Sequence, residues 1–249
     1  MKTNLLLPIA GNGQRFIDKG YKDPKPLIEI NGKTILDRSL ESVKTDNCNL
    51  IFIIREDHCK DHNLNLILRS KYKDCKIVII PGLTDGALST CLLAKDHIDN
   101  DQPLIIFTPD CYFEPQIDPD NINEKFDGMV CVFESDSPAH SYVRLMYKLQ
   151  EDVGKEDYVC DVAEKEVISN LAIGGLYYWK KGSNFGTIRD NAELISCKES
   201  LLCRCKKSVK NHRNPQKSPQ SPHANPDAPP PGGRVLWCLQ IWRGSQKII

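Results

Sequence analysis

The sequence lacks any apolar run that approaches the roughly 20 residues needed to span a bilayer. It also lacks net charge, because 33 Lys and Arg residues balance 33 Asp and Glu residues. The apolar stretch from Leu5 to Ala10 near the N-terminus is too short for a secretory signal. We therefore expect a cytoplasmic protein with neither a membrane nor a nucleic acid as its partner.

Paired cysteines are missing as well. The eleven cysteines are scattered, and none forms the Cys-x-x-Cys pair of common zinc modules. Cys203 and Cys205 lie near His212 in the sequence, but their spacing fits no common zinc site. We interpret the cysteines as reduced thiols of a cytosolic protein, several of them facing the core.

The sequence does contain alternating strand-like and helix-like segments. Short apolar runs, typical of strands covered on both faces, span residues 5–9, 50–54, 76–80 and 104–107. Between them, apolar residues recur at helical spacing over residues 34–44, 64–68 and 87–97. This alternation predicts an α/β fold with a parallel sheet and helices on both faces.

The pattern changes after Asp110. Strand-like segments with few helices between them span residues 129–133, 142–147, 158–162 and 171–179, and one further helix is expected over 184–194. We therefore expect a mixed sheet in which this half builds a platform on the first. The predicted domain spans residues 1–196, in two halves of about 1–110 and 111–196.

Residues 197–249 differ in composition from the rest of the chain. Ten Lys and Arg residues against two Asp and Glu residues give this segment about +8, so residues 1–196 carry about −8. The segment holds seven of the sixteen prolines, and residues 214–233 show no apolar periodicity. Such a composition buries too little apolar surface to fold, so we expect a disordered, basic, proline-rich tail.

A glycine-rich loop follows the first predicted strand. It comprises Ala10, Gly11, Asn12 and Gly13, and Arg15 comes two residues later. Glycine lets the backbone approach a ligand closely, so exposed N–H groups can wrap a phosphate, and arginine adds a fixed charge. Phe16 replaces the third glycine of a dinucleotide-binding fingerprint, which excludes that motif.

The segment Gly32-Lys33-Thr34 matches only the end of a Walker loop, since Leu27 stands at the required first glycine. We interpret Asn31-Gly32 as a turn before a helix. Pro24 and Pro26 stiffen the backbone around Lys25, and a rigid loop that presents one ammonium suits a triphosphate. In isolation, Pro-Lys-Pro is more typical of a solvated loop lysine.

Taken together, Leu7 to Arg15 and Pro24 to Lys33 strongly resemble the N-terminal signature of the nucleotidyltransferase family. That family includes sugar-phosphate nucleotidylyltransferases and cytidylyltransferases. The resemblance implies a Rossmann-like, mixed but mainly parallel sheet of the nucleotide-diphospho-sugar transferase type. It also implies that the glycine loop binds the nucleotide and that Arg15 and Lys25 act on its phosphates. Residues 1–110 would form the nucleotide-binding half and residues 111–196 the sugar-phosphate half.

Two further segments extend the resemblance. Thr84, Gly86 and Ala87 lie where the family places a glycine segment against the base. Asp110 lies where the family has a metal-binding aspartate, which implies Mg²⁺ as cofactor and a catalytic role for Asp110. Without the family context, Asp110 would suit a turn residue after a proline equally well. The sequence Asp99-Asn100-Asp101 precedes its strand, so we interpret it as a solvated turn.

The second half also resembles the family, through Ser141 to Arg144, Glu164 to Ser169 and Ala172 to Tyr178. By resemblance, Glu164 accepts hydrogen bonds from sugar hydroxyls and Lys165 holds the 1-phosphate, with Tyr142 and Gly174 in the same site. Taken alone, Glu-Lys-Glu is common on solvated surfaces. The resemblance covers about residues 4–190, and no second metal-binding aspartate is recognisable after Cys197.

The predicted activity is transfer of a nucleotide from a nucleoside triphosphate to a sugar 1-phosphate, with release of pyrophosphate. These two molecules are the expected partners, and homo-oligomer formation is left open. Two alternatives remain at this point. One is a cytidylyltransferase for a non-sugar phosphate such as phosphocholine. The other is a catalytically inactive nucleotide-binding or regulatory paralogue, which the atypical C-terminal segment favours.

Overall fold

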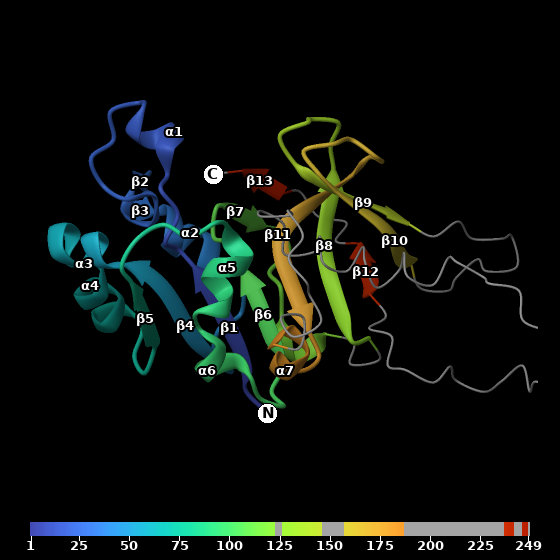
Figure 1. Ribbon diagram of the computed structural model, residues 1–249, viewed down its shortest axis with the longest axis horizontal. Helices are drawn as coiled ribbons and strands as arrows, with labels where there is room; N and C mark the ends of the chain where they lie inside the picture. The colour runs from blue at the N-terminus through green and yellow to red at the C-terminus, as the bar shows by residue number, and fades with distance from the viewer. Residues whose placement is uncertain (123–125, 146–156, 187–236, 242–245, 249) are drawn as a thin grey trace, which may run out of the picture.

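The computed structural model describes residues 1–122, 126–145, 157–186, 237–241 and 246–248. A twisted nine-stranded sheet runs through the molecule, with helices packed on its faces (Figure 1). Its strand order is β5-β4-β1-β6-β11-β8-β12-β10-β9. Within the described residues, no helix has the length and apolar character needed to cross a membrane.

The first half of the sheet is parallel. β1 (Thr3–Pro8) pairs with β4 (Cys48–Arg55) on one side and with β6 (Leu104–Phe107) on the other. β5 (Lys76–Ile80) lies beyond β4. The chain therefore moves from β1 outward to β5 and then returns to the opposite side of β1. In open α/β sheets, such a reversal of strand order marks the ligand site, at the carboxyl ends of the strands.

The second half of the sheet is mixed. β11 (Leu171–Trp179) lies antiparallel between β6 and β8 (Gly128–Glu134). β10 (Asp157–Glu164) and β9 (Ser141–Leu145) form an antiparallel pair at the far edge. β9 also meets β11 at the pair Ala172 and Tyr142, so this end of the sheet curls back on itself.

Both faces of the sheet are buried, as the continuous apolar runs predict. In β1, Leu5 and Leu7 join a first core cluster while Leu6 joins a second on the opposite face. The first cluster packs against α2 (Ile35–Leu40), α3 (Glu56–His62) and α4 (Leu64–Lys71). The second packs against α5 (Ala87–Leu92), α6 (Lys95–Ile98) and α7 (Gly182–Gly186). The predicted fold class, a Rossmann-like mixed sheet with helices on both faces, is confirmed.

Local differences from the predicted elements have physical causes. Asn31 and Gly32, with φ of 50° and 76°, form the two-residue turn between β2 (Glu29–Ile30) and β3 (Lys33–Thr34). This is the turn that Asn-Gly favours in hairpins. Thr34 then caps α2 by accepting a hydrogen bond from the Asp37 N–H. The predicted helix over 87–97 is divided into α5 and α6 at Ala94, whose φ of −94° and ψ of 14° are not helical.

The structure describes two strands within residues 197–249, and the disorder expected for that segment as a whole stays a prediction. β12 (Trp237–Ile241) lies between β8 and β10, parallel to β8. β13 (Gln246–Ile248) pairs with β7 (Cys111–Phe113), directly after Asp110 (Figure 1). The apolar sequence from Trp237 to Ile241 is typical of a strand, and the average composition of the tail conceals it. The candidate zinc residues and residues 187–194 of the last predicted helix lie outside the described residues.

Candidate active site at the carboxyl edge of the sheet

The glycine loop leaves β1 at the carboxyl edge of the sheet. Gly13 has a φ of 63°, a conformation that glycine adopts without strain, and α1 (Gln14–Ile17) begins directly after it. A Cβ atom at Gly13 would lie 3.3 Å from the Lys25 Cβ. The absence of a side chain therefore lets the Pro-Lys-Pro segment pack against the loop. Ala10 is buried, whereas Gly11, Asn12 and Arg15 are exposed.

Lys25 is held between the loop and the centre of the sheet. It begins η1 (Lys25–Leu27), a single 3-10 turn that follows the extended Pro24 and contains the buried Pro26. The Lys25 Nζ lies 2.9 Å from the Asp110 Oδ2 and 5.9 Å from the centroid of the Phe16 ring. The side chain is only 28% exposed, so its ammonium is oriented in the absence of substrate.

Asp110 reaches this position because it follows β6. Its N–H donates to the Thr108 carbonyl at 2.9 Å, which folds the chain over the strand end. Its side chain is 50% exposed and faces Lys25. Since β6 and β1 are parallel neighbours, their carboxyl ends place Asp110 and the glycine loop at one edge. The structure thus brings together the three predicted phosphate and metal elements.

β11 fixes the Asp110 segment from the other side. The Thr108 N–H donates to the Gly175 carbonyl at 2.9 Å, and a Cβ atom at Gly175 would overlap the Thr108 hydroxyl oxygen. Gly175 has a φ of 77°, within an irregularity in the pairing of β11 with β8. Gly174 is buried, and its carbonyl accepts a hydrogen bond from the Cys111 thiol at 3.1 Å. Gly174 therefore contributes backbone that positions Asp110.

The segment expected against the base is also well fixed. Gly86 precedes α5 with a φ of 134°, a conformation that L side chains rarely adopt. The hydroxyl groups of Thr84 and Thr90 both donate to its carbonyl, at 3.1 and 3.0 Å. Ala87 then opens the helix. The nucleotide-binding role of this segment stays a prediction.

The residues expected to bind the sugar phosphate are placed differently from one another. Glu164 ends β10 and accepts a hydrogen bond from the Ser141 hydroxyl. Lys165 follows, exposed and with a φ of 52°. Tyr142 is completely buried, and its hydroxyl donates to the Ser137 carbonyl at 2.8 Å. The Tyr142 ring and hydroxyl are therefore both engaged within the protein.

Tyr177 of β11 is a buried residue of the second core cluster. Burial raises the pKa of its hydroxyl far above the usual value, and the Glu164 and Asp110 carboxylates raise it further. No separate sequence signal singles out Tyr177, because an aromatic residue in an apolar strand is typical of a core.

Arg55 is a second site residue that the motifs did not reveal. It ends β4 beside the glycine loop, and its side chain is only 11% exposed. Its guanidinium forms a forked contact with Asp57 and holds the pKa of that carboxyl down at about 2. The one available signal was the charge that ends the apolar run Ile51 to Ile54.

No group of three or more His, Cys, Asp or Glu side chains is arranged to hold a metal within the described part of the chain. Asp110 is thus a single candidate ligand, and its role with Mg²⁺ stays a prediction. The other acidic motif lies before β6, at the opposite end of that strand. Asp101 pairs there with Lys181 at 2.8 Å and is 78% exposed, which is typical of a solvated turn.

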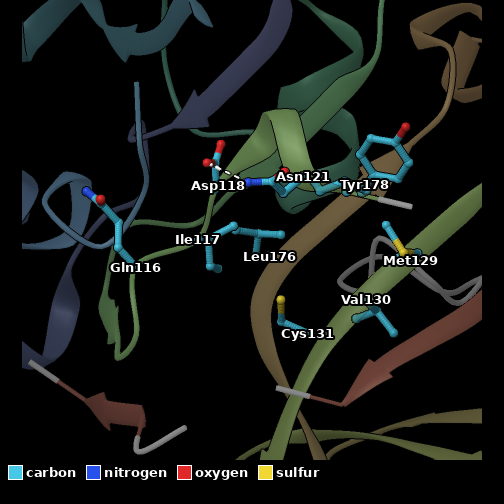
Figure 2. Close-up of a pocket in the computed structure, with 10 residues that line it drawn as sticks. Gln116, Ile117, Asp118, Asn121, Met129, Val130, Cys131, Leu176 and Tyr178 are labelled. Atoms are coloured by element: carbon cyan, nitrogen blue, oxygen red, sulfur yellow. Dashed lines mark hydrogen bonds between the residues drawn. The ribbon is translucent and has the colours of Figure 1, made fainter. Parts of the chain in front are cut away.

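A cavity of about 210 Å³ lies elsewhere, against the first core cluster (Figure 2). Asn121 donates to the Asp118 carboxylate at 2.9 Å on its polar side. Burial raises the pKa of the Cys131 thiol to about 12, so this group stays protonated near neutral pH. None of the predicted site residues lines this cavity, which is bounded by Gln116, Ile117, Asp118, Asn121, Ile122, Met129, Val130, Cys131, Leu176 and Tyr178.

Comparison with known proteins gives one similar sequence and several similar folds. No model of a known protein family matches the chain. The chain is 29% identical over 178 residues to the bifunctional protein GlmU of Methanocaldococcus jannaschii. The match covers 69% of this chain and 38% of the relative, so the chain spans well under half the length of GlmU.

Three solved structures illustrate the fold. The nucleoside-diphosphate-sugar pyrophosphorylase of Vibrio cholerae has a TM-score of 0.69 at 21% identity, over 83% of this chain and 88% of that one. A UDP-glucose pyrophosphorylase complexed with UDP-glucose has a TM-score of 0.67 at 16% identity, over 99% of this chain and 92% of that one. The inositol-1-phosphate CTP transferase of T. maritima has a TM-score of 0.66 at 12% identity, over 100% of this chain and 88% of that one. The chain is therefore similar in sequence to part of GlmU, and it shares its fold with the solved pyrophosphorylases.

Proposed function

We propose that this chain joins a nucleoside triphosphate to a sugar 1-phosphate and releases a nucleotide-sugar and pyrophosphate. The observation that carries the proposal is the 2.9 Å contact between the Lys25 Nζ and the Asp110 Oδ2 beside the glycine loop. It unites a cation, a carboxylate and a flexible backbone at the edge where such sheets bind ligands. The similarity to GlmU and the fold of the solved pyrophosphorylases support it.

The reaction is an in-line displacement at the α-phosphorus. An oxygen of the sugar 1-phosphate forms a new bond to this phosphorus as the bond to the oxygen that bridges to the β-phosphate breaks. The electron pair of the broken bond leaves with pyrophosphate. No acid–base residue is required, because the attacking phosphate is already an anion. The protein contributes positioning and neutralisation of charge.

The triphosphate would meet the glycine loop and two cations. Backbone N–H groups of Gly11 to Gly13 hold phosphate oxygens, and Arg15 adds a guanidinium from α1. Lys25 is already oriented toward an anionic partner, Asp110, so little ordering is needed when a phosphate approaches. The segment Thr84 to Ala87, fixed at the start of α5, faces the nucleoside.

Asp110 fits a magnesium ligand. Mg²⁺ commonly takes one or two protein carboxylates and completes its shell with substrate phosphates and water. A half-exposed carboxylate at the phosphate-binding edge meets that requirement. When bound, Mg²⁺ supplies neutralisation of the phosphate charge and orients the phosphate oxygens.

The sugar 1-phosphate would lie against the second half of the sheet. Glu164 ends β10 and Lys165 follows it directly. Glu164 accepts from sugar hydroxyls and Lys165 pairs with the phosphate. Because Tyr142 is buried, we assign it the support of β9 rather than contact with the sugar.

A second candidate function follows from one of the similar folds. The inositol-1-phosphate CTP transferase of T. maritima has this fold, which keeps cytidylyl transfer to a non-sugar phosphate in view. Nucleotide binding without turnover is the remaining candidate, because no second metal-binding aspartate is recognisable in the sequence after Cys197. The cytoplasmic location and homo-oligomer formation stay predictions.

The test is pyrophosphate release by the full chain with Mg²⁺, each common nucleoside triphosphate and a panel of acceptors. The panel contains several sugar 1-phosphates, inositol 1-phosphate and phosphocholine, with a reaction without acceptor as control. We expect release that depends on a sugar 1-phosphate and on one or a few bases. Release with CTP and phosphocholine alone would favour the second candidate. Nucleotide binding without release from any pair would overturn the enzymatic proposal.

A further inference from the structure

Arg55 stands where the sheet meets the glycine loop. β4 and β1 are parallel neighbours, with Ile53 opposite Pro8. The Ile9 N–H then donates to the Ile53 carbonyl at 3.0 Å, so the chain stays against β4 as it enters the loop. Arg55 is the last residue of β4 and lies beside that entry.

The Arg55 guanidinium is fixed on one edge by Asp57. Its Nε donates to Asp57 Oδ1 at 2.9 Å and its Nη2 donates to Asp57 Oδ2 at 2.6 Å. Asp57 Oδ1 also accepts from the His58 N–H at 2.9 Å, so the carboxylate is itself anchored to α3. A forked contact of this kind sets the plane of the guanidinium as well as its position.

The remaining edge of the guanidinium points to the loop. Its Nη1 lies 3.5 Å from the Asn12 Oδ1, a long hydrogen bond. The Asn12 amide donates to Gln14 at 2.7 Å, and the Gln14 amide donates to Asp18 at 2.7 Å. Each of these residues thus donates to the next, so one chain of hydrogen bonds runs from the buried Arg55 across the loop to Asp18 at the end of α1.

We propose that Arg55 is a positioning residue for the phosphate-binding loop, and that it acts through Asn12. It holds the loop in the shape in which the N–H groups of Gly11 to Gly13 converge on a polyphosphate. The identity of the ligand as a triphosphate rests on the proposed function, whereas the anchoring of the loop does not. A purely structural pair of Arg55 with Asp57 would stabilise the strand end and leave the loop unaffected.

Inorganic tripolyphosphate is the probe for binding, because it carries the phosphates of the nucleotide without a base. We expect Arg55→Gln and Asn12→Ala each to raise its Kd about tenfold, which matches the loss of one charge-assisted hydrogen bond. The double variant should bind no more weakly than either single variant, since both changes break one path. Arg55→Lys keeps the charge and loses the fork, so it should weaken binding as well.

Amide hydrogen exchange reports the loop without any ligand. In Arg55→Gln, residues 10–18 should exchange faster than in the wild type, while the strands should exchange at the same rate. Arg69→Gln, an exposed arginine in α4, is the matched control and should change neither measurement. Asn12 is exposed, so Asn12→Ala keeps the test valid if Arg55→Gln lowers stability.

The outcomes separate this inference from the proposed function. Unchanged loop exchange and unchanged Kd in Arg55→Gln would overturn the positioning role and leave the proposed function standing. Additive losses in the double variant would also overturn it. Faster loop exchange in Arg55→Gln, with no tripolyphosphate binding by the wild type, would support the anchoring and contradict the proposed role of the loop.

Discussion

At the scale of single residues, Gly175 determines how closely β11 approaches Thr108, in the segment that joins β6 to Asp110. Its φ of 77° is a conformation glycine favours, and a Cβ atom there would overlap the Thr108 hydroxyl. Gly20 has a similar φ of 85°, but a Cβ atom there would meet nothing within 4 Å. Substitutions at the two glycines therefore distinguish the cost of a strained backbone conformation from the cost of a steric overlap.

We expect Gly175→Ala to lower the free energy of unfolding by about 2 kcal/mol or more, because strain and overlap each cost about 1–2 kcal/mol. Gly20→Ala should carry the strain alone, about 1 kcal/mol. Urea unfolding of both variants measures the difference. Equal losses in the two variants would show that the close contact with Thr108 contributes nothing.

Lys25 is the residue on which the chemical proposal depends most. Loss of a substrate-facing cation that stabilises developing charge costs several kcal/mol, so Lys25→Ala should lower kcat/KM by about 10²-fold or more. Lys33→Ala is the control, because Lys33 is 52% exposed and pairs with Glu41 away from the site. Steady-state pyrophosphate release provides the measurement. A folded Lys25→Ala with unchanged kcat and KM would rule out its role.

Asp110 is the test residue for the metal site, and Asp101 is its matched control. Asp110→Asn should fold normally and lose activity that depends on Mg²⁺, since an amide is a much poorer magnesium ligand than a carboxylate. Asp101→Asn should behave as wild type, because Asp101 is exposed before β6. The experiment is a Mg²⁺ titration of pyrophosphate release. A wild-type titration curve for Asp110→Asn would count decisively against the ligand role.

At the scale of elements, β12 decides whether the tail belongs to the domain. β12 lies between β8 and β10, so its removal would leave both strands without their common neighbour. A chain that ends at residue 236 should therefore melt about 2–8 °C below the full chain, as a loss of about 1–2 kcal/mol implies for this size. A chain that ends at residue 241 keeps β12 and loses only β13, so it should melt close to the full chain.

Differential scanning calorimetry of the three chains tests whether β12 is integrated, as the structure predicts, or disordered, as the composition of the tail predicts. Equal melting temperatures for all three would show that the tail is not integrated, as its charge and proline content predict. If the chain that ends at residue 236 melts at the same temperature as the full chain, β12 does not stabilise the sheet.

The elements that the sequence predicted well are those whose local pattern of apolar residues follows directly from their burial in the fold. Runs such as Ile51 to Ile54 are buried on both faces, so their apolar continuity is sufficient to identify them. β12 was missed because a five-residue strand is concealed within a basic, proline-rich average. The predicted helix over 87–97 was divided because periodicity does not register the backbone break at Ala94.

At the scale of the whole molecule, the site exists because distant segments end at one edge of the sheet. Lys25 and Asp110 are 85 residues apart, and only the adjacency of β1 and β6 brings them to 2.9 Å. The motifs predicted which residues lie there, through glycine, proline and charge. They did not predict Arg55, whose placement depends on the pairing of β4 with β1. Nor did they show that Tyr142 is buried, since a tyrosine can face either side of a strand.

The central claim is that a sugar 1-phosphate attacks the α-phosphorus and that pyrophosphate leaves. The most direct measurement uses sugar 1-phosphate labelled with ¹⁸O in its phosphate oxygens, with mass spectrometry of both products. The account predicts that all of the label is found in the nucleotide-sugar and none in pyrophosphate. Label in pyrophosphate, or no labelled nucleotide-sugar with any base, would contradict it.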